Sequence, residues 1–546
     1  MFKVIVDKKV FEFDDKITLN ELSKKLNKKS YVAIVNNTLR ELNFYINFDC
    51  EVEFLGLDDF EAVKVYETSL RYLIIMALEK LYPNVVVNFT QSISRSIACT
   101  VENVGIVDLE FLNKLENEMR RLVELDLPIT RSTISLEEAC KIYSEKKYFD
   151  KVNVLKYRKE DTVNIYKCDD YVNYLYGYMV PSTGLLKDFK LGLYHPGFVV
   201  QYPRAEFGGN IPKFESSLSF GRMIKEAEKW SKNCMCYDIP HLNKHAESVS
   251  VIDLINMCET KHTNMLADLG QKIKDDIENI RLICIAGPSS SGKTTFSHRL
   301  RLQLMTRGIK PVKISMDDYY KDRDLAPLDS DGKPDLEHVE ALDLKLFNEH
   351  LLSLIEGKEI TLPVFNFKTG KREWGEKLKV DINSPIIIEG IHALNEEVTK
   401  LIPKFQKFKI YISPTPQINI DNHAPIRPTE LRMLRRIVRD LQFRKTDPRD
   451  TFAMWASVRR GEFKWIYPFQ EEADYIFNTE LTYELGVMKK HAINALKKIN
   501  RRDEFYVQAN RLIKFLKYVV DIDDKYVPCN SLLREFIGGS CFEELK

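Results

Sequence analysis

The residues with the clearest chemical signature form a glycine-rich segment in the second half of the chain. Residues 287–294 fit the pattern G-x-x-x-x-G-K-[ST], between an apolar segment, RLICIA, and a helix-favouring one, TTFSHRLRLQLM. Glycines let backbone N–H groups close around phosphate oxygens, and a helix that begins at the loop adds its dipole. The pattern predicts a nucleoside triphosphate site, with Lys293 on the β- and γ-phosphates and the Thr294 hydroxyl on Mg²⁺. The residues expected to line this site are Gly287, Ser289, Ser290, Ser291, Gly292, Lys293, Thr294 and Thr295.

Acidic residues follow two further apolar segments. Asp317 and Asp318 come directly after PVKISM, and Glu389 ends PIIIE. In an open parallel sheet the carboxyl ends of the strands face the ligand crevice. We therefore expect Asp317 to accept a proton from an attacking hydroxyl, and Glu389 to hold Mg²⁺ directly or through water. The structural alternatives are a helix cap for the aspartates and a salt bridge or cap for the glutamate.

A basic segment lies between residues 431 and 449. It carries seven Lys or Arg against two Asp, a local charge of +5 in a chain whose formal net charge is +1. Arg432, Arg435, Arg436 and Arg439 recur at helical spacing and share one face. Because arginine suits bidentate phosphate contacts, we interpret this helix as a lid over transferring phosphates. A solvated charged face and an RNA-binding helix are the alternatives.

Six segments of the C-terminal half occur in the order found in the uridine kinase/phosphoribulokinase family, which this region, about residues 280–480, resembles. They are GPSSSGKTT, MDDYYKD, EHVEALD, LPVFNF, IIIEGIHAL and LRRIVRD. The resemblance implies a P-loop kinase with a mostly parallel sheet and an Arg-bearing lid. It also implies ATP and Mg²⁺ as cofactors and transfer of the γ-phosphate to a nucleoside 5′-hydroxyl.

The resemblance also implies roles for individual residues. Asp317 falls on the catalytic base, Tyr320 on a tyrosine of the nucleoside pocket, and Glu389 on the acid near Mg²⁺. Arg436 and Arg439 fall on lid arginines that contact phosphate, and we expect Arg444 to join them. Catalysis is thus expected from Asp317, Lys293, Arg436 and Arg439.

Three positions depart from the family pattern on the acceptor side. The ribose-binding aspartate is replaced by Glu337, which is one methylene longer, and the base-holding Tyr and His are replaced by Phe365 and Gly370. We expect the acceptor to lie against Tyr320, Glu337, Phe365 and Arg436. The phosphate-side chemistry is intact, so phosphorylation by ATP is better supported than uridine as its acceptor.

The N-terminal half resembles two modules of threonyl-tRNA synthetases. Residues 1–61 resemble a TGS domain, a β-grasp module in which Thr18 and Glu21 fit a capping box. Residues 62–204 resemble the editing domain, through LEKLYP, LPITRSTISLEEA and YVNYLYGYMVPSTG. The editing chemistry needs an H-x-x-x-H helix and a distal Cys and His, where this chain has Thr68, Tyr72, Leu175 and Met179. We therefore expect a retained scaffold without metal-dependent or general-base editing.

Composition limits the remaining choices. The chain has 546 residues, 44% of them hydrophobic and 29% charged, which is typical of globular proteins. Its near-neutral charge excludes a chain-wide field for nucleic acid. Ten scattered cysteines, no apolar run of membrane-spanning length and an acidic start indicate a cytoplasmic protein with reduced thiols.

The predicted fold class is an α/β P-loop kinase with a mostly parallel sheet, preceded by a β-grasp module and an α+β synthetase-like domain. A helical connector at 205–275 leads to the kinase unit at 276–546. The leading hypothesis is a nucleoside kinase acting on a small-molecule, uridine- or cytidine-like substrate, without a membrane partner. The alternatives are an ATP-responsive RNA- or ribosome-associated protein and a kinase for another small alcohol. RNA contact through the N-terminal half and homo-oligomer formation stay open.

Overall fold

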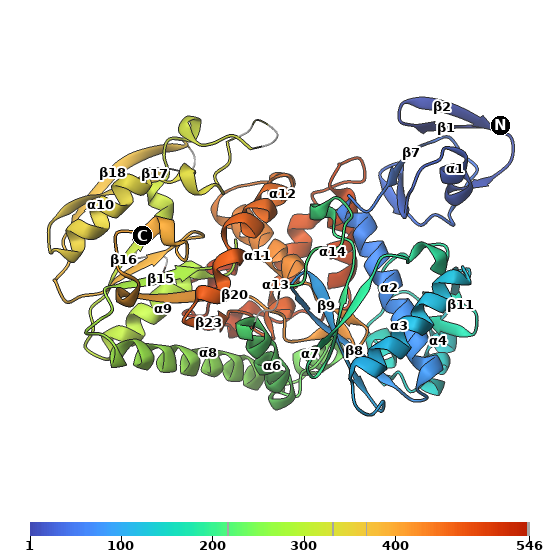
Figure 1. Cartoon of the computed structure of the whole chain (residues 1–546), viewed down its shortest axis with the longest axis horizontal. Helices are drawn as coiled ribbons and strands as arrows, with labels where there is room; N and C mark the ends of the chain where they lie inside the picture. Colours follow the sequence, from blue (N-terminus) through green and yellow to red (C-terminus); the bar gives the residue numbers. More distant parts are fainter. Residues whose placement is uncertain (216–217, 330–331, 333, 367–368, 543–546) are drawn as a thin grey trace.

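The structure, a computed structural model, describes residues 1–215, 218–329, 332, 334–366 and 369–542 (Figure 1). Its first part is a sheet in the order β2-β1-β7-β4-β5 with one short helix. Thr18 Oγ1 accepts from the Glu21 N–H at 3.1 Å, and the Glu21 carboxylate accepts from the Thr18 N–H at 2.9 Å, so the expected capping box is confirmed. The elements are β1 (Phe2–Val6), β2 (Lys9–Phe13), β3 (Ile17–Thr18), α1 (Leu19–Lys25), β4 (Val32–Val35), β5 (Thr38–Arg40), β6 (Tyr45–Ile46) and β7 (Cys50–Leu55).

A long buried helix, α2 (Phe60–Leu81), opens the second part. Asp59 caps it by accepting from the Glu61 and Ala62 N–H groups at 2.7 and 3.3 Å. Beside it lie an antiparallel sheet in the order β13-β14-β9-β8 and a small sheet β10-β11-β12. The other elements are β8 (Val86–Ile93), β9 (Ser96–Glu102), α3 (Leu109–Glu124), β10 (Thr130–Ser135), α4 (Leu136–Glu145), α5 (Phe149–Leu155), β11 (Thr162–Cys168), β12 (Tyr171–Asn173), β13 (Lys190–Tyr194) and β14 (Gly197–Gln201).

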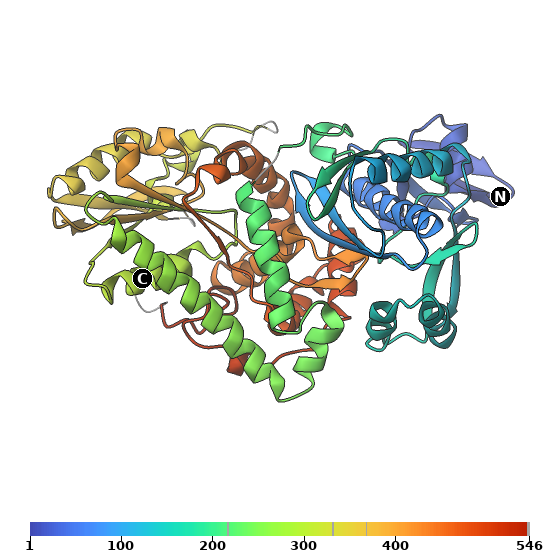
Figure 2. The same cartoon turned by 60° about the horizontal axis from the view of Figure 1, so that its bottom comes forward.

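Three helices connect this region to the C-terminal half: α6 (Leu218–Asn233), α7 (Ile239–Ala246) and α8 (Ser250–Asp275). Figure 2 shows them in green, with the long α8 lying along the C-terminal half. Helix α8 packs against α9 (Lys293–Met305), and Arg299 Nη1 lies 3.4 Å from Glu259 Oε2 across that contact. Among the helices of the described residues, none has the length and apolar character needed to cross a membrane.

The C-terminal half is built on a five-stranded sheet in the order β16-β19-β15-β20-β23, in which every pair is parallel. Its strands are β15 (Leu282–Ala286), β16 (Val312–Ser315), β19 (Ile386–Glu389), β20 (Lys407–Ser413) and β23 (Tyr475–Asn478). β15 is the central strand, and all five of its residues are buried. This buried parallel sheet between helices is the architecture that the apolar segments predicted.

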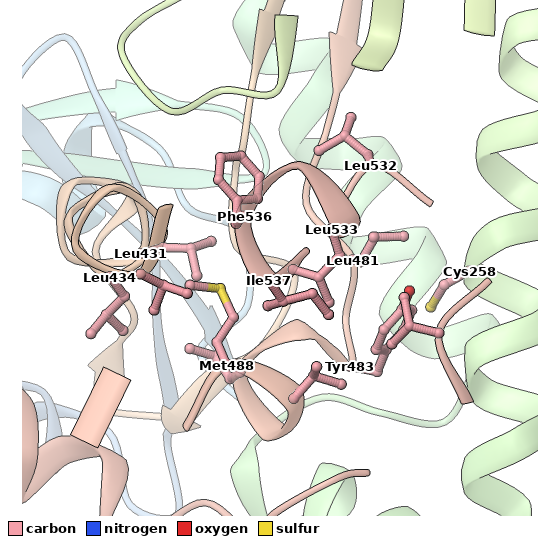
Figure 3. Close-up of a cluster of buried hydrophobic side chains, with 14 of the residues drawn as sticks. Cys258, Leu431, Leu434, Leu481, Tyr483, Met488, Leu532, Leu533, Phe536 and Ile537 are labelled. Atoms are coloured by element: carbon pink, nitrogen blue, oxygen red, sulfur yellow. The ribbon is translucent and has the colours of Figure 1, made fainter. Parts of the chain in front are cut away.

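Helices and hairpins surround the sheet and complete the half. They are α10 (Leu344–Ile355), β17 (Ile360–Asn366), β18 (Lys371–Leu378), β21 (Asn419–Asp421), β22 (Ala424–Pro425), α11 (Pro428–Phe443), α12 (Pro448–Trp465), α13 (Glu484–Leu496), α14 (Tyr506–Leu516) and α15 (Arg534–Ile537). The C-terminal segment packs inward: Leu532, Leu533, Phe536 and Ile537 lie among side chains of α11 and α13 (Figure 3).

The β21–β22 hairpin joins the two halves. Asp421, at its tip, pairs with Lys151 of α5 at 2.9 Å, and both side chains are buried. The Phe89 N–H donates to Asn422 O at 2.8 Å, and the Asn419 amide donates to Phe89 O at 3.0 Å. Helix α11 begins three residues after this hairpin, so the N-terminal half is connected directly to the helix that carries the basic segment.

Candidate functional site

Two glycines shape the loop between β15 and α9. A Cβ on Gly287 would lie 2.2 Å from Ile412 O of the neighbouring strand, so no other residue fits there without a backbone shift. Gly292 has φ +90°, which is strained for other residues, and it precedes α9 without a side-chain cap. The hydroxyls of Ser290 and Ser291 are buried and have no hydrogen-bond partner among the described residues. The loop therefore presents unpaired hydroxyls beside the N-terminus of α9, as an anion site requires.

The ends of three strands bring the polar groups together. Lys293 Nζ donates to the loop carbonyls Gly287 O and Pro288 O at 2.9 and 3.2 Å, and burial lowers its pKa. Thr294 Oγ1 donates to Glu389 Oε1, at the end of β19, at 3.4 Å. Glu389 also pairs with Lys313 of β16 at 3.4 Å, so the salt-bridge alternative is present beside the hydroxyl contact. The Thr294 hydroxyl and the Glu389 carboxylate are thus adjacent, and oxygen atoms of these two kinds are the ligands that Mg²⁺ prefers.

The two aspartates after β16 have different surroundings. Asp318 Oδ1 accepts from the Phe365 N–H at 3.3 Å and so anchors β17, and burial raises the pKa of Asp318 to about 6. Asp317 makes no hydrogen bond or ion pair with the rest of the described chain. Burial raises the Asp317 pKa, with the Glu389 charge adding to the effect, while Lys293 and two arginines oppose it. Asp317 is therefore the one of these two carboxylates that interacts with Lys293 of the loop and does not anchor another element through a hydrogen bond.

The residues expected on the acceptor side lie near one another, and the negative charge of Glu337 acts on the hydroxyl of Tyr320. The rings of Tyr320 and Phe365 are 5.5 Å apart, and both side chains are buried. Glu337 is close to α12, where a Cβ on Gly461 would lie 2.5 Å from the Glu337 Cβ. Burial raises the Glu337 pKa to about 7, and the positive charge of Arg436 opposes that rise. Gly370 closes the β17–β18 turn with φ +70°.

Three arginines at the C-terminal end of α11 gather around Asp440. Asp440 pairs with Arg439 at 2.7 Å, Arg436 at 3.2 Å and Arg444 at 3.7 Å. Arg436 Nη1 also donates to Ser289 Oγ of the loop at 2.8 Å. The Arg444 pKa is lowered to about 10, mainly by the charge of Arg439. One carboxylate therefore holds three cations beside the loop and Asp317.

The prediction that all four arginines of the basic face form a lid is wrong for two of them. Arg432 and Arg435 are buried in ion pairs with Glu462 and Glu484, respectively. Arg432 also donates to Ser289 O at 3.2 Å, and Arg435 to Ser290 O at 3.4 Å. A buried arginine without a counter-ion would be too costly, and the two glutamates provide that counter-ion. The paired arginines then support the loop by donating to its carbonyls. The helix is a packed support for the loop rather than a solvated face.

The C-terminal segment contributes a contact that the sequence did not indicate. Glu535 Oε2 accepts from the Thr295 N–H, in the first turn of α9, at 2.9 Å. The side chain of Leu532 lies against Gly292, where an added Cβ would be 2.4 Å from Leu532 Cδ2. Lys313, the partner of Glu389, was also missed. Glu535, Leu532 and Lys313 have no recognisable motif role, so only the folded chain shows their contacts with the loop and with Glu389.

The four positions that replace editing chemistry in the N-terminal half are all buried. The Tyr72 hydroxyl donates to the carbonyls of Tyr166 and Tyr171 at 3.0 and 2.9 Å. Leu175 and Met179 belong to the hydrophobic core around α2, and Thr68 lies against Gly177. These positions serve packing. Within the described ranges, no three or more His, Cys, Asp or Glu side chains are grouped so that they could hold a metal ion together.

Comparisons with known proteins divide the chain in the same way. The sequence model of the phosphoribulokinase / uridine kinase family matches residues 282–484. The N-terminal half matches threonine–tRNA ligases. The ligase of Thermotoga sp. (strain RQ2) is 32% identical over 195 residues, 34% of this chain and 29% of the ligase. That of Clostridium kluyveri is 31% identical over 215 residues, 38% and 34% of the two chains. The chain thus spans about a third of the length of these curated relatives.

Two solved structures are similar to the chain at low identity. A candidate fructose transport system kinase from Silicibacter sp. TM1040 has 19% identity and a TM-score of 0.30, over 39% of this chain and 98% of that one. A candidate uridine kinase from Bacillus stearothermophilus has 18% identity and a TM-score of 0.25, over 38% and 100%. The family match and the parallel sheet with its phosphate loop carry the assignment. The C-terminal half therefore contains a P-loop kinase domain of the phosphoribulokinase / uridine kinase family, joined to an N-terminal half similar to threonine–tRNA ligases.

Proposed function

We propose that the protein is an ATP-dependent kinase that transfers the γ-phosphate of ATP to the 5′-hydroxyl of a nucleoside. The observation that carries this proposal is the position of Asp317. It follows the edge strand β16 without a structural partner among the described residues, and Lys293, Glu389 and Arg439 all act on its pKa. A carboxylate so placed can accept the proton of an attacking hydroxyl, while cations stabilise the charge on the transferred phosphoryl group.

The residues of the loop fit ATP and Mg²⁺. The N–H groups at the start of α9 and the unpaired hydroxyls of Ser290 and Ser291 would donate to phosphate oxygens, with Glu535 competing for the Thr295 N–H. Thr294 and Glu389 would hold Mg²⁺, which neutralises charge on the phosphates when it is bound. Arg436, Arg439 and Arg444 would contact the phosphates from α11. Lys293 would leave its two loop carbonyls for the β- and γ-phosphates.

The acceptor would lie against Tyr320, Phe365 and Glu337. Two rings 5.5 Å apart offer an apolar surface, and the Glu337 carboxylate can accept hydrogen bonds from sugar hydroxyls. The test is ATP consumption by the full chain with a panel of nucleosides and other small alcohols, with and without tRNA. Turnover with a free nucleoside supports the proposal. Turnover only with another alcohol would instead support a kinase for that alcohol. ATP hydrolysis that tRNA stimulates, without a phosphorylated product, would support an ATP-responsive RNA- or ribosome-associated protein.

Acceptor binding should depend on pH through Glu337. Its pKa of about 7 means that the carboxyl is mostly protonated at pH 6 and mostly ionised at pH 8. The ionised form is the better hydrogen-bond acceptor, so the KM for the acceptor should fall as the pH rises from 6 to 8. Glu337→Gln should have a high KM that is insensitive to pH across this range. A wild-type KM that stays flat or rises with pH would contradict this role.

Glu535 should weaken ATP binding. Its carboxylate occupies the Thr295 amide and adds negative charge where phosphates would bind. Glu535→Gln keeps an oxygen acceptor but removes the charge, so ATP should bind about tenfold more tightly by titration calorimetry. Glu504→Gln, which neutralises an exposed carboxylate of the same C-terminal region, is the matched control and should leave the Kd unchanged. Equal affinity of the two variants and the wild type would exclude the effect.

A further inference from the structure

The last described residues of the chain, 529–542, form a strap that lies over the start of helix α9. In the middle of the strap, Glu535 Oε2 accepts from the Thr295 N–H at 2.9 Å. At its far end, the ring of Phe542 stacks on that of His298, with the ring centres 5.3 Å apart and the ring planes 9° from parallel. The strap therefore contacts two successive turns of the helix that follows the phosphate loop.

The strap has a buried middle and surface ends. Phe536 and Ile537, in the short helix α15, belong to the hydrophobic core that also includes side chains of α11 and α13 (Figure 3). Gly538 and Gly539 follow with φ +90° and +72°, values that favour glycine. These two residues reverse the direction of the chain, so the end of the strap returns to its beginning.

Two cysteines meet where the strap returns. The Cys541 N–H donates to Cys529 O at 3.0 Å. A backbone hydrogen bond of this kind brings the two Cα atoms to about 5–6 Å, within the range of about 4.4–6.8 Å that a disulfide spans. Partial burial and a hydrogen bond with the Cys529 side chain raise the pKa of Cys541, so the two thiols are also in contact. The sulfur atoms can therefore bond with little movement of the backbone.

Exposure separates this pair from the other cysteines. Of the ten cysteines, Cys529 and Cys541 are exposed, Cys140 is partly buried and the other seven are buried. An oxidant in solution reaches exposed thiols first, because the reaction requires access to the sulfur atom. Disulfides between exposed cysteines are also more easily reduced again than buried ones. The pair thus fits a reversible link rather than a permanent structural one.

We propose that Cys529 and Cys541 form a reversible disulfide within the chain, with a low-molecular-weight disulfide such as glutathione disulfide as the oxidant. The thiolate of one cysteine attacks a sulfur atom of the oxidant, and one glutathione leaves as its thiolate. The thiolate of the other cysteine then attacks the protein sulfur of the mixed disulfide and releases the second glutathione. The two cysteines lose two electrons and two protons, which the oxidant gains as it becomes two thiols.

The disulfide should also weaken ATP binding, a consequence that rests on the proposed function. A phosphate that takes the Thr295 N–H must displace the Glu535 carboxylate. Closing the strap into a loop limits the movement by which Glu535 can leave. Apparent affinity falls in proportion to the population of the binding-competent state, so a tenfold smaller population raises the Kd for ATP about tenfold.

The test treats the full chain with glutathione disulfide and analyses the product by mass spectrometry. We expect a monomer lighter by two hydrogen atoms, a cross-linked peptide containing Cys529 and Cys541 in its digest, and reversal by dithiothreitol. Cys529→Ser and Cys541→Ser should each fail to form this link. Cys140→Ser, which removes the partly buried thiol, is the matched control and should form the link as fully as the wild type.

Titration calorimetry with ATP and Mg²⁺ then measures the consequence. We expect the Kd to rise about tenfold on oxidation of the wild type and to stay constant when Cys529→Ser is treated in the same way. The proposal is overturned if the two cysteines stay unlinked, keep bound glutathione or link separate chains. A disulfide that leaves the Kd unchanged overturns its effect on the loop. If neither form binds ATP, the proposed function fails, while the disulfide identified by its mass stands.

Discussion

Replacing Asp317 by Asn should lower kcat by about 10²- to 10⁴-fold while the Kd for ATP changes little. The amide keeps the size of the side chain but cannot accept the proton of an attacking hydroxyl. ATP binding should survive because its phosphates would be held by the loop, Lys293 and the arginines. Steady-state kinetics with the identified acceptor and calorimetry with ATP measure the two quantities separately.

The neighbouring aspartate provides a matched control for this variant. Asp318→Asn keeps an oxygen that can accept from the Phe365 N–H, so β17 should stay anchored and kcat should change only a few-fold. The two variants differ by one position and have the same chemistry. Equal loss of kcat in both, or full activity of Asp317→Asn, would show that Asp317 is not the base.

Replacing two arginines on the same face of α11 by Met should affect different properties, stability for Arg435 and turnover for Arg439. Arg435 is fully buried against Glu484, so Arg435→Met leaves an unpaired buried carboxylate. Breaking such a pair costs about 3–5 kcal/mol of unfolding free energy. The midpoint of urea unfolding, followed by circular dichroism, should therefore fall clearly. The loop should also loosen, because Arg435 donates to Ser290 O.

Arg439→Met should leave that midpoint nearly unchanged. Arg439 is partly exposed, and its partner Asp440 keeps Arg436 and Arg444 as counter-ions. Its loss should instead lower kcat by about 10³-fold or more, as expected for an arginine on a transferring phosphoryl group. A stability loss in Arg439→Met equal to that in Arg435→Met would contradict the division of roles on this helix.

Local patterns predicted much of the fold. The capping box of Thr18 and Glu21 depends on four consecutive residues, and it forms as expected. The apolar segments before Gly287, Asp317 and Glu389 all became strands of one parallel sheet. Helix α2 begins at Phe60, because Asp59 caps it upstream of the apolar residues that recur at helical spacing from Leu70 to Leu81. Patterns over a few residues thus indicate where a helix or strand lies, whereas the residue at which it begins depends on capping contacts.

Long-range partners were beyond such patterns. Helical spacing placed Arg432 and Arg435 on one face with Arg436 and Arg439, but their carboxylate partners are 30 and 49 residues away. Charge alone could not separate arginines paired in the core from arginines beside the loop. The contact between Glu535 and Thr295 spans 240 residues and has no local signature. The residues expected at the site could be named from the sequence, whereas the residues that support the loop or compete for its amides could be identified only in the fold.

The most direct test of the proposed kinase activity follows the γ-phosphate itself. The full chain is incubated with γ-labelled ATP, Mg²⁺ and uridine or cytidine, and the products are separated and identified by mass spectrometry. We expect a labelled nucleoside 5′-monophosphate in a one-to-one ratio with ADP, and about a hundredfold less or lower still with Asp317→Asn over the same time. Release of the label as inorganic phosphate, with no labelled nucleoside at any acceptor concentration, would contradict the account.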